Sequence, residues 1–135
     1  MIVGTLVDSN VILDVFTGDP VWATWSTNAI AAAAERGPLI INPMIYAEVS
    51  VRFTTIEELD DALPHDDFLR VPLPWDAAFL AGKAYLNYRK NGGARTSPLP
   101  DLFIGAHAAV AGLSLLTRDR GRYASCFPTV HLDTP

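Results

Sequence analysis

Four carboxylates in this chain stand where a side chain could take part in chemistry. Two follow short apolar runs that have the character of buried strands, and two stand near the starts of expected helices. In chain order they are Asp8, Glu48, Asp101 and Asp119. Strand ends and helix starts of an α/β protein meet at one edge of its sheet, where the ligands of such proteins bind. The four acids are therefore candidates for one shared site.

The chemistry open to such a cluster depends on a cation. Four carboxylates that met without one would repel one another and could not all stay ionised in a dry site. A donor set of oxygen atoms without His or Cys favours Mg²⁺ or Mn²⁺ over Zn²⁺. Magnesium held by few carboxylates keeps several waters, one of which can act as a nucleophile toward a phosphate. Phosphodiester hydrolysis is the reaction that fits this ligand set best.

Simpler explanations exist for two of these acids taken singly. Asp8 begins an Asp-Ser-Asn run, and all three residue types are common helix N-caps. Glu48 stands among apolar neighbours, where an unpaired buried carboxylate is costly. Arg52, four residues later, could neutralise it in a plain helical salt bridge. Both explanations remain open at this point.

The elements that must position the acids alternate between strands and helices. Strands are expected at residues 2–7, 39–41, 68–73, 113–116 and 129–132. Helices are expected at residues 11–16, 21–36, 44–53, 55–63, 74–91 and 100–111. This alternation predicts a parallel-sheet α/β fold, a three-layer α/β/α sandwich with helices on both faces of the sheet.

Local signals support several of these boundaries. Asn42 and Pro43 suit the N-cap and first position of a helix. The run from Thr55 to Glu58 matches a capping box, and Gly112 is expected to end the helix that carries Asp101. The last strand is expected at a sheet edge.

Size and composition limit the classes of protein to which this chain can belong. The chain has 135 residues, half of them apolar, which predicts a single domain over residues 1–135. The one cysteine, Cys126, permits no internal disulfide and fits a reducing compartment. Without a recognisable signal peptide or membrane span, a cytoplasmic location is expected.

Charge is distributed unevenly along the chain. The net charge is −5, which argues mildly against indiscriminate nucleic-acid binding. Residues 57–67 carry six acids and no Lys or Arg, whereas residues 83–122 carry seven basic residues against two acids. A basic rim around acidic residues suits a polyanion held over bound cations, although solvated helix faces explain single charges equally well.

Four segments together resemble the PIN-domain ribonucleases, and most of all the VapC toxins of bacterial toxin–antitoxin pairs. They are Asp-Ser-Asn-Val-Ile-Leu-Asp at 8–14, Ala-Glu-Val at 47–49, Pro-Asp-Leu-Phe-Ile-Gly-Ala-His-Ala at 100–108 and Leu-Thr-Arg-Asp at 116–119. Each motif is weak alone, but the ordered set spans the whole chain at separations compatible with that family.

The resemblance implies a metal-dependent endoribonuclease. Its cofactor would be Mg²⁺ or Mn²⁺, its substrate RNA, and its partners a second copy of the chain and a cognate antitoxin. By position, Asp8, Glu48 and Asp101 would be metal ligands, and Asp119 would help to hold metal or orient water. Supporting residues would be Ser9, Asn10 and Thr117, and phosphate contacts would come from Arg95, Arg118 and Arg120. His107, on an Ala-rich helix, is expected to be a packed or surface histidine.

Rival functions are weaker but distinct. An aspartyl-phosphate phosphatase needs a second Asp two residues after the first, where this chain has Asn10. No Gly-rich phosphate loop or dinucleotide fingerprint occurs. A structure-specific DNA nuclease on the same fold and a catalytically silent PIN-like interaction module both remain as alternatives.

Overall fold

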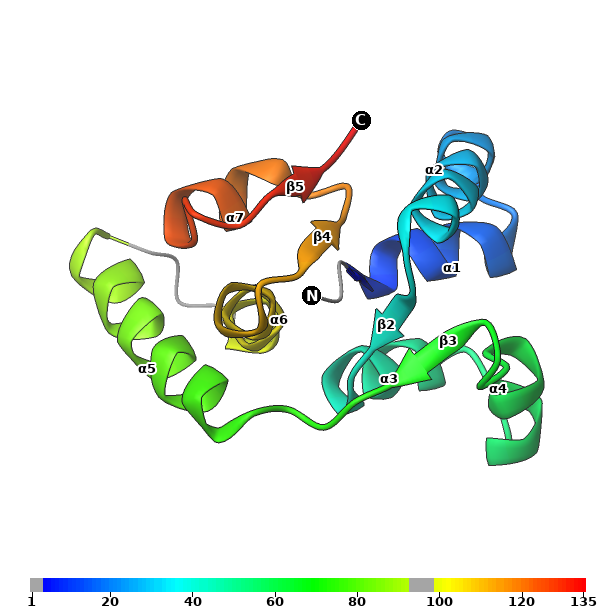
Figure 1. The fold of residues 1–135 in the computed structure, drawn as a ribbon, viewed down its shortest axis with the longest axis horizontal. Helices are drawn as coiled ribbons and strands as arrows, with labels where there is room; N and C mark the ends of the chain where they lie inside the picture. The colour runs from blue at the N-terminus through cyan, green and yellow to red at the C-terminus, as the bar shows by residue number, and fades with distance from the viewer. Residues whose placement is uncertain (1–3, 93–98) are drawn as a thin grey trace.

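The computed structural model describes residues 4–92 and 99–135, except for the side chain of Arg122. Within these ranges the chain forms a five-stranded parallel sheet in the order β3-β2-β1-β4-β5 (Figure 1). The strands are β1 (Thr5–Val7), β2 (Leu39–Ile41), β3 (Phe68–Arg70), β4 (Ser114–Leu116) and β5 (Leu132–Asp133). The predicted parallel sheet is confirmed, with the last strand at an edge.

Helices flank this sheet. They are α1 (Ser9–Thr17), α2 (Ala23–Arg36), α3 (Pro43–Ser50), α4 (Ile56–Ala62), α5 (Trp75–Lys90), α6 (Leu99–Ala111) and α7 (Arg120–Cys126). Helices α1 and α2 pack together on one side of the sheet, while α6 packs with α5 and α7 on the other (Figure 1). The predicted α/β/α sandwich is therefore confirmed.

The helix boundaries follow the local signals in the sequence. The side chain of Asn42 accepts a hydrogen bond from the Ile45 N–H with Pro43 at the first helical position, and Thr55 caps α4 through the Glu58 N–H. Gly112 has a φ of 66°, a left-handed conformation that glycine adopts without steric cost. It ends the helix that carries Asp101.

β4 begins at Ser114, one residue later than predicted, and β1 begins at Thr5, while residues 2 and 3 of the expected strand lie outside the described residues. β3 and β5 differ from the prediction as well. β3 ends at Arg70 instead of Leu73, because Pro72 and Pro74 have no N–H to donate to a neighbouring strand. β5 begins at Leu132 instead of Thr129, because a turn closed by the Val130 N–H on the Phe127 carbonyl follows α7. Only two residues of the last strand then pair with β4.

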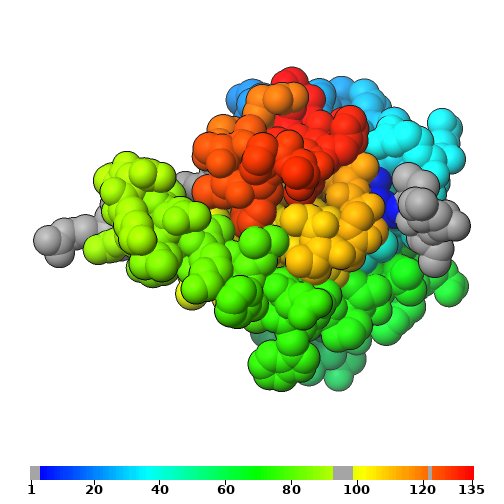
Figure 2. All heavy atoms as spheres, turned by 60° about the vertical axis from the view of Figure 1, so that its left-hand side comes forward, coloured from blue at the N-terminus to red at the C-terminus, as the bar shows by residue number. Residues whose placement is uncertain are grey.

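The core lies between the sheet and its helices. Leu6 and Val7 of β1, Leu115 and Leu116 of β4, and Ile41 of β2 are almost fully shielded from water. Helix α5 runs along the outside of α6 and reaches beyond the main body in the space-filling view (Figure 2). Within the described ranges, none of the helices has both the length and the apolar character needed to cross a bilayer.

Candidate active site

The candidate site lies at the carboxyl ends of β1 and β4. The strand that follows β1 in the chain, β2, pairs on one side of β1, whereas β4 pairs on its other side. The strand order therefore reverses between β1 and β4. This reversal point is where open α/β sheets bind their ligands. Asp8 follows β1, and its N–H donates to the Leu116 carbonyl at the end of β4 (2.9 Å).

Asp8 is buried, and its contacts are with neutral groups. Its Oδ1 accepts from the Ser9 N–H at 2.7 Å, so it is the predicted N-cap of α1. Its Oδ2 accepts from the hydroxyls of Thr117 (2.7 Å) and Tyr123 (3.0 Å). Burial raises the pKa of Asp8, and the nearby charge of Asp101 raises it further, against the lowering effect of these hydrogen bonds. A carboxylate in this position gains from a cation.

Glu48 is brought to the same place by α3, which contacts both α1 and α6. It lies in the last turn of α3, not near the helix start as predicted, because α3 ends at Ser50. The Ser9 hydroxyl donates to its Oε1 at 2.9 Å. No described residue forms an ion pair with Glu48, so the salt bridge to the exposed Arg52 is not formed. Partial burial raises the pKa of Glu48, and the charges of Asp8 and Asp101 raise it as well.

Asp101 completes a group of three interacting acids. It stands in the first turn of α6, and its Oδ1 lies 3.5 Å from the Tyr123 hydroxyl, which also donates to Asp8. The charge of Asp101 contributes to the raised pKa of both Asp8 and Glu48. Three of the four predicted acids therefore act on one another electrostatically. The outermost two, Asp8 and Asp101, are 93 residues apart in the sequence.

The fourth acid, Asp119, joins this group through its backbone. Its N–H donates to the Thr117 hydroxyl oxygen at 3.0 Å, and the same hydroxyl donates to Asp8. Asn10 contacts that oxygen as well, through its Nδ2 at 3.4 Å, and its Oδ1 accepts from the Arg118 N–H at 3.3 Å. The three predicted supporting residues thus lie among the acids, while the catalytic role of each stays a prediction.

The predicted phosphate-contacting arginines differ in their surroundings. The Arg118 guanidinium forms a two-pronged pair with Asp14, at 2.7 and 3.0 Å, and its carbon lies 5.1 Å from the centroid of the Trp22 ring. Arg120 is exposed and donates from Nε to the Thr134 hydroxyl at 3.2 Å. Arg95 lies outside the described residues. For all three, contact with phosphate stays a prediction.

His107 is a packed histidine, as the sequence predicted. It is 2% exposed, and its Nδ1 lies 2.9 Å from the Nδ2 of Asn42, the N-cap of α3. Burial lowers the pKa of the His107 imidazole, which favours the neutral ring. An amide nitrogen is only a donor, so Nδ1 is the acceptor and the ring proton sits on Nε2. The pair joins α6 to the N-cap of α3.

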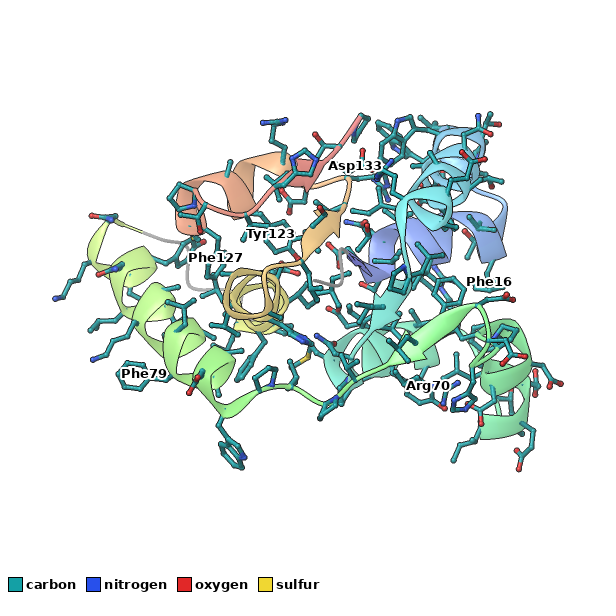
Figure 3. The ribbon with its side chains drawn as sticks, in the orientation of Figure 1. Phe16, Arg70, Phe79, Tyr123, Phe127 and Asp133 are labelled. Carbon is teal, nitrogen blue, oxygen red and sulfur yellow. The ribbon has the colours of Figure 1, made fainter. Side chains whose placement is uncertain are left out.

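Two residues at the site were missed from the sequence. Asp14 was noted only as the end of a motif, although it is 3% exposed and holds Arg118 and the Ser26 hydroxyl. Tyr123 has no role predicted from the sequence, yet its side chain lies between α7 and α6 (Figure 3). The spacing of Tyr123 and Phe127, one turn apart, could have predicted an inward-facing aromatic pair.

The donor set at this edge fits a hard divalent cation in its chemistry. The interacting acids supply only oxygen atoms, and the buried Asp8 has no cationic partner among the described residues. In the described part of the chain, however, no three His, Cys, Asp or Glu side chains stand close enough to hold one ion together. Binding with few direct carboxylates and several retained waters, the usual mode of Mg²⁺, is the one that fits.

The PIN domain family matches the chain over residues 5–125. This span includes all four acids and every element from β1 to most of α7, so the chain belongs to the PIN domain family. Members of this family are nucleases, which agrees with the reaction class inferred from the carboxylates. No curated protein gives a significant match to the chain.

Solved structures share the fold at low sequence identity. VapBC2 from Rickettsia felis, bound to a DNA fragment from its promoter, is 15% identical with a TM-score of 0.74, and covers 97% of this chain and 98% of its own. VapBC-1 from nontypeable Haemophilus influenzae is 17% identical with a TM-score of 0.72, covering 96% of each chain. A toxin–antitoxin complex from Klebsiella pneumoniae is 22% identical with a TM-score of 0.68, covering 98% of each chain.

Proposed function

We propose that this protein is a Mg²⁺- or Mn²⁺-dependent endoribonuclease that acts as the toxin of a toxin–antitoxin pair. The observation that carries the proposal is the meeting of Asp8, Glu48 and Asp101 at the reversal point of the sheet, with neutral donors around the buried Asp8. Membership of the PIN domain family and a fold shared with VapBC complexes support the same conclusion.

In this proposal the three acids hold the cation, with few direct carboxylate contacts and the rest through retained waters, and the neighbouring polar groups orient them. Ser9 holds Asp8 through its N–H and Glu48 through its hydroxyl, so one residue sets the positions of two acids. Thr117 fixes Oδ2 of Asp8 and carries the Asp119 backbone toward the same place, where Asp119 can orient a water. A bound divalent cation would supply an activated water and stabilise the departing oxygen of the phosphodiester.

The lack of a described cationic partner at the buried Asp8 argues against a silent interaction module. Burying Asp8 beside two other acids disfavours its ionised form, and a protein that only binds a partner gains nothing from that cost. Asp14 shows that this chain does neutralise a buried acid elsewhere, through Arg118. The lack of such a partner at Asp8, among the described residues, therefore points to a cation from solution.

An antitoxin partner is part of the proposal. Three of the solved structures with this fold are described as VapBC or toxin–antitoxin complexes, and a toxic nuclease needs a protein to silence it. A second copy of the chain is also proposed, because the family resemblance implies a homodimer. Co-purification with the product of an adjacent small gene, followed by loss of cleavage on its addition, would test the antitoxin.

Cleavage assays with purified protein test the nuclease. Structured RNA and single- and double-stranded DNA are incubated with Mg²⁺, Mn²⁺ or a chelator. We expect cutting of RNA that needs metal and is lost in Asp8→Asn and Asp101→Asn, while Asp67→Asn, a change at an exposed acid outside the site, cuts normally. Cutting of DNA alone would replace the proposal with the DNA-nuclease alternative. Failure of the wild-type protein both to cut and to bind metal would favour the interaction module.

A further inference from the structure

The Tyr123 hydroxyl lies between two acids that come from different elements. It is 3.0 Å from Oδ2 of Asp8, after β1, and 3.5 Å from Oδ1 of Asp101, in the first turn of α6. A hydroxyl has one proton, so it donates to Asp8 at the shorter distance and has Asp101 as its next acceptor. The hydroxyl thus links two proposed cation-binding groups that come from the end of β1 and the start of α6.

The ring that carries this hydroxyl is held in place by close packing. Tyr123 is 1% exposed, and it faces Gly105 of α6, one turn after Asp101. A Cβ at Gly105 would stand 3.0 Å from a Tyr123 ring carbon and closer still to the ring of Phe127. The glycine therefore lets α6 approach both rings (Figure 3). The position of the hydroxyl is then set by α6 and α7 together.

The hydrogen bonds of Asp8 leave its two oxygens unequal. Oδ2 accepts from both Thr117 and Tyr123, which uses the two lone pairs of a carboxylate oxygen. Oδ1 accepts one short bond, from the Ser9 N–H at 2.7 Å, with the Ser9 hydroxyl only at 3.5 Å. Oδ1 is therefore the oxygen of Asp8 with acceptor capacity to spare.

We propose that Tyr123 is a positioning residue of the cation site: its hydroxyl fixes the Asp8 carboxylate against Asp101, occupies Oδ2 together with Thr117, and leaves Oδ1 to ligate the cation. This inference rests on the proposed function in assuming that a divalent cation binds at these acids. The tyrosine hydroxyl is a hydrogen-bond donor, and its shorter contact is with Asp8.

Tyr123→Phe tests this role because it removes the hydroxyl and keeps the ring that packs against Gly105. The matched control is Tyr85→Phe on α5, a half-buried tyrosine whose hydroxyl contacts none of the four acids. Circular dichroism and thermal melts in chelator confirm that each variant is folded at the working temperature. Binding of Mn²⁺ is then measured by calorimetry, and independently by the rise in melting temperature with Mn²⁺ concentration.

We expect Tyr123→Phe to bind Mn²⁺ about ten- to a hundredfold more weakly than the wild type, as for other residues that orient metal ligands. Tyr85→Phe should bind it unchanged. In RNA cleavage, the Mn²⁺ concentration for half-maximal activity should rise by the same factor, with the rate recovering at saturating Mn²⁺. A merely structural tyrosine would not move this concentration.

The outcomes separate this inference from the proposed function. One outcome is that the wild type binds Mn²⁺ and Tyr123→Phe binds it within about twofold of the wild-type affinity. This change is too small for a residue that orients a metal ligand, so it would overturn the role of Tyr123 and leave the proposed nuclease function intact. If the wild type itself binds no Mn²⁺, the proposed function fails and takes this inference with it.

Discussion

Two buried aspartates of one short segment have opposite surroundings. Asp8, the N-cap of α1, and Asp14, in the middle of that helix, are each 3% exposed. Asp14 accepts two bonds from the Arg118 guanidinium and one from the Ser26 hydroxyl. Asp8 accepts only from neutral donors and has a second carboxylate, Asp101, as its charged neighbour.

This difference separates a structural acid from a functional one. Arg118 follows β4, Ser26 stands on α2, and Asp14 joins the two, so its charge holds secondary-structure elements together. Asp8 stands at the reversal point of the sheet with a charge that no described cationic residue balances. Burial alone therefore does not identify a catalytic acid; the partner does.

The largest effect is expected from Asp8→Asn on cleavage. The amide keeps the shape but loses the charge that binds the cation, so we expect RNA cleavage to fall more than about a hundredfold, beyond the loss typical of a residue that only orients a ligand. Stability should be unchanged or higher in chelator, because the change relieves burial and repulsion of a charge. Cleavage rates and thermal melts measure both. A large drop in melting temperature would contradict this assignment of Asp8.

Asp14→Asn should have the reverse effects. It leaves Arg118 without its partner, so we expect a loss of unfolding free energy of about 2 to 3 kcal/mol, less than for a fully buried pair because Arg118 keeps some contact with water. Urea unfolding measures the loss. Asp133→Asn is the control, since its pair with the half-exposed Arg36 should contribute less than about 1 kcal/mol. Equal losses in the two variants would show that Asp14 is no structural anchor.

A smaller effect concerns pH and the metal-free protein. Burial raises the folded-state pKa of Asp8 above its ordinary value of 3.8, so the folded protein binds more protons than the unfolded chain above that pH. Stability from this group is then lost as pH rises through the raised pKa. The stability of the wild type should therefore fall relative to Asp8→Asn as pH rises above about 4, with both proteins in chelator. Parallel stability curves for the two proteins would refute the raised pKa.

The smallest effect is expected from Arg120→Ala. Unlike Arg118, Arg120 forms no ion pair with an acid among the described residues. In an Asp101→Asn background that binds RNA without cutting it, the slope of log affinity against log salt should fall by about one. Lys83→Ala, at an exposed lysine beside Phe79 on α5, is the control and should leave the slope unchanged. An unchanged slope in Arg120→Ala would remove Arg120 from the RNA surface.

Local signals in the sequence predicted helix boundaries well where a single residue sets the backbone conformation. Asn42 caps α3, Thr55 caps α4, and Gly112 ends α6, each through a contact or dihedral confined to a few neighbouring residues. The run of short strands between helices then predicted the parallel sheet. Strand ends were less predictable, because prolines after β3 and a turn after α7 shortened two strands.

The site divides in the same way. Asp8 and Asp101 could be found because each stands at an element start that the sequence reveals, and Glu48 because it is an acid among apolar neighbours. The pairing of Asp14 with Arg118 joins residues 104 apart, and nothing local distinguishes it from a free surface arginine. Tyr123 was missed for a similar reason, since its hydroxyl acquires a role only when α7 packs against Gly105 of α6.

Anomalous scattering from a crystal soaked in Mn²⁺ would show which of the two buried aspartates, Asp8 or Asp14, binds a cation. We expect a peak about 2 Å from Oδ1 of Asp8, close to Asp101 and Glu48, with Asp14 still bound to Arg118. Crystals that diffract well and show no peak at Asp8 under saturating Mn²⁺, or a peak at Asp14 instead, would contradict it.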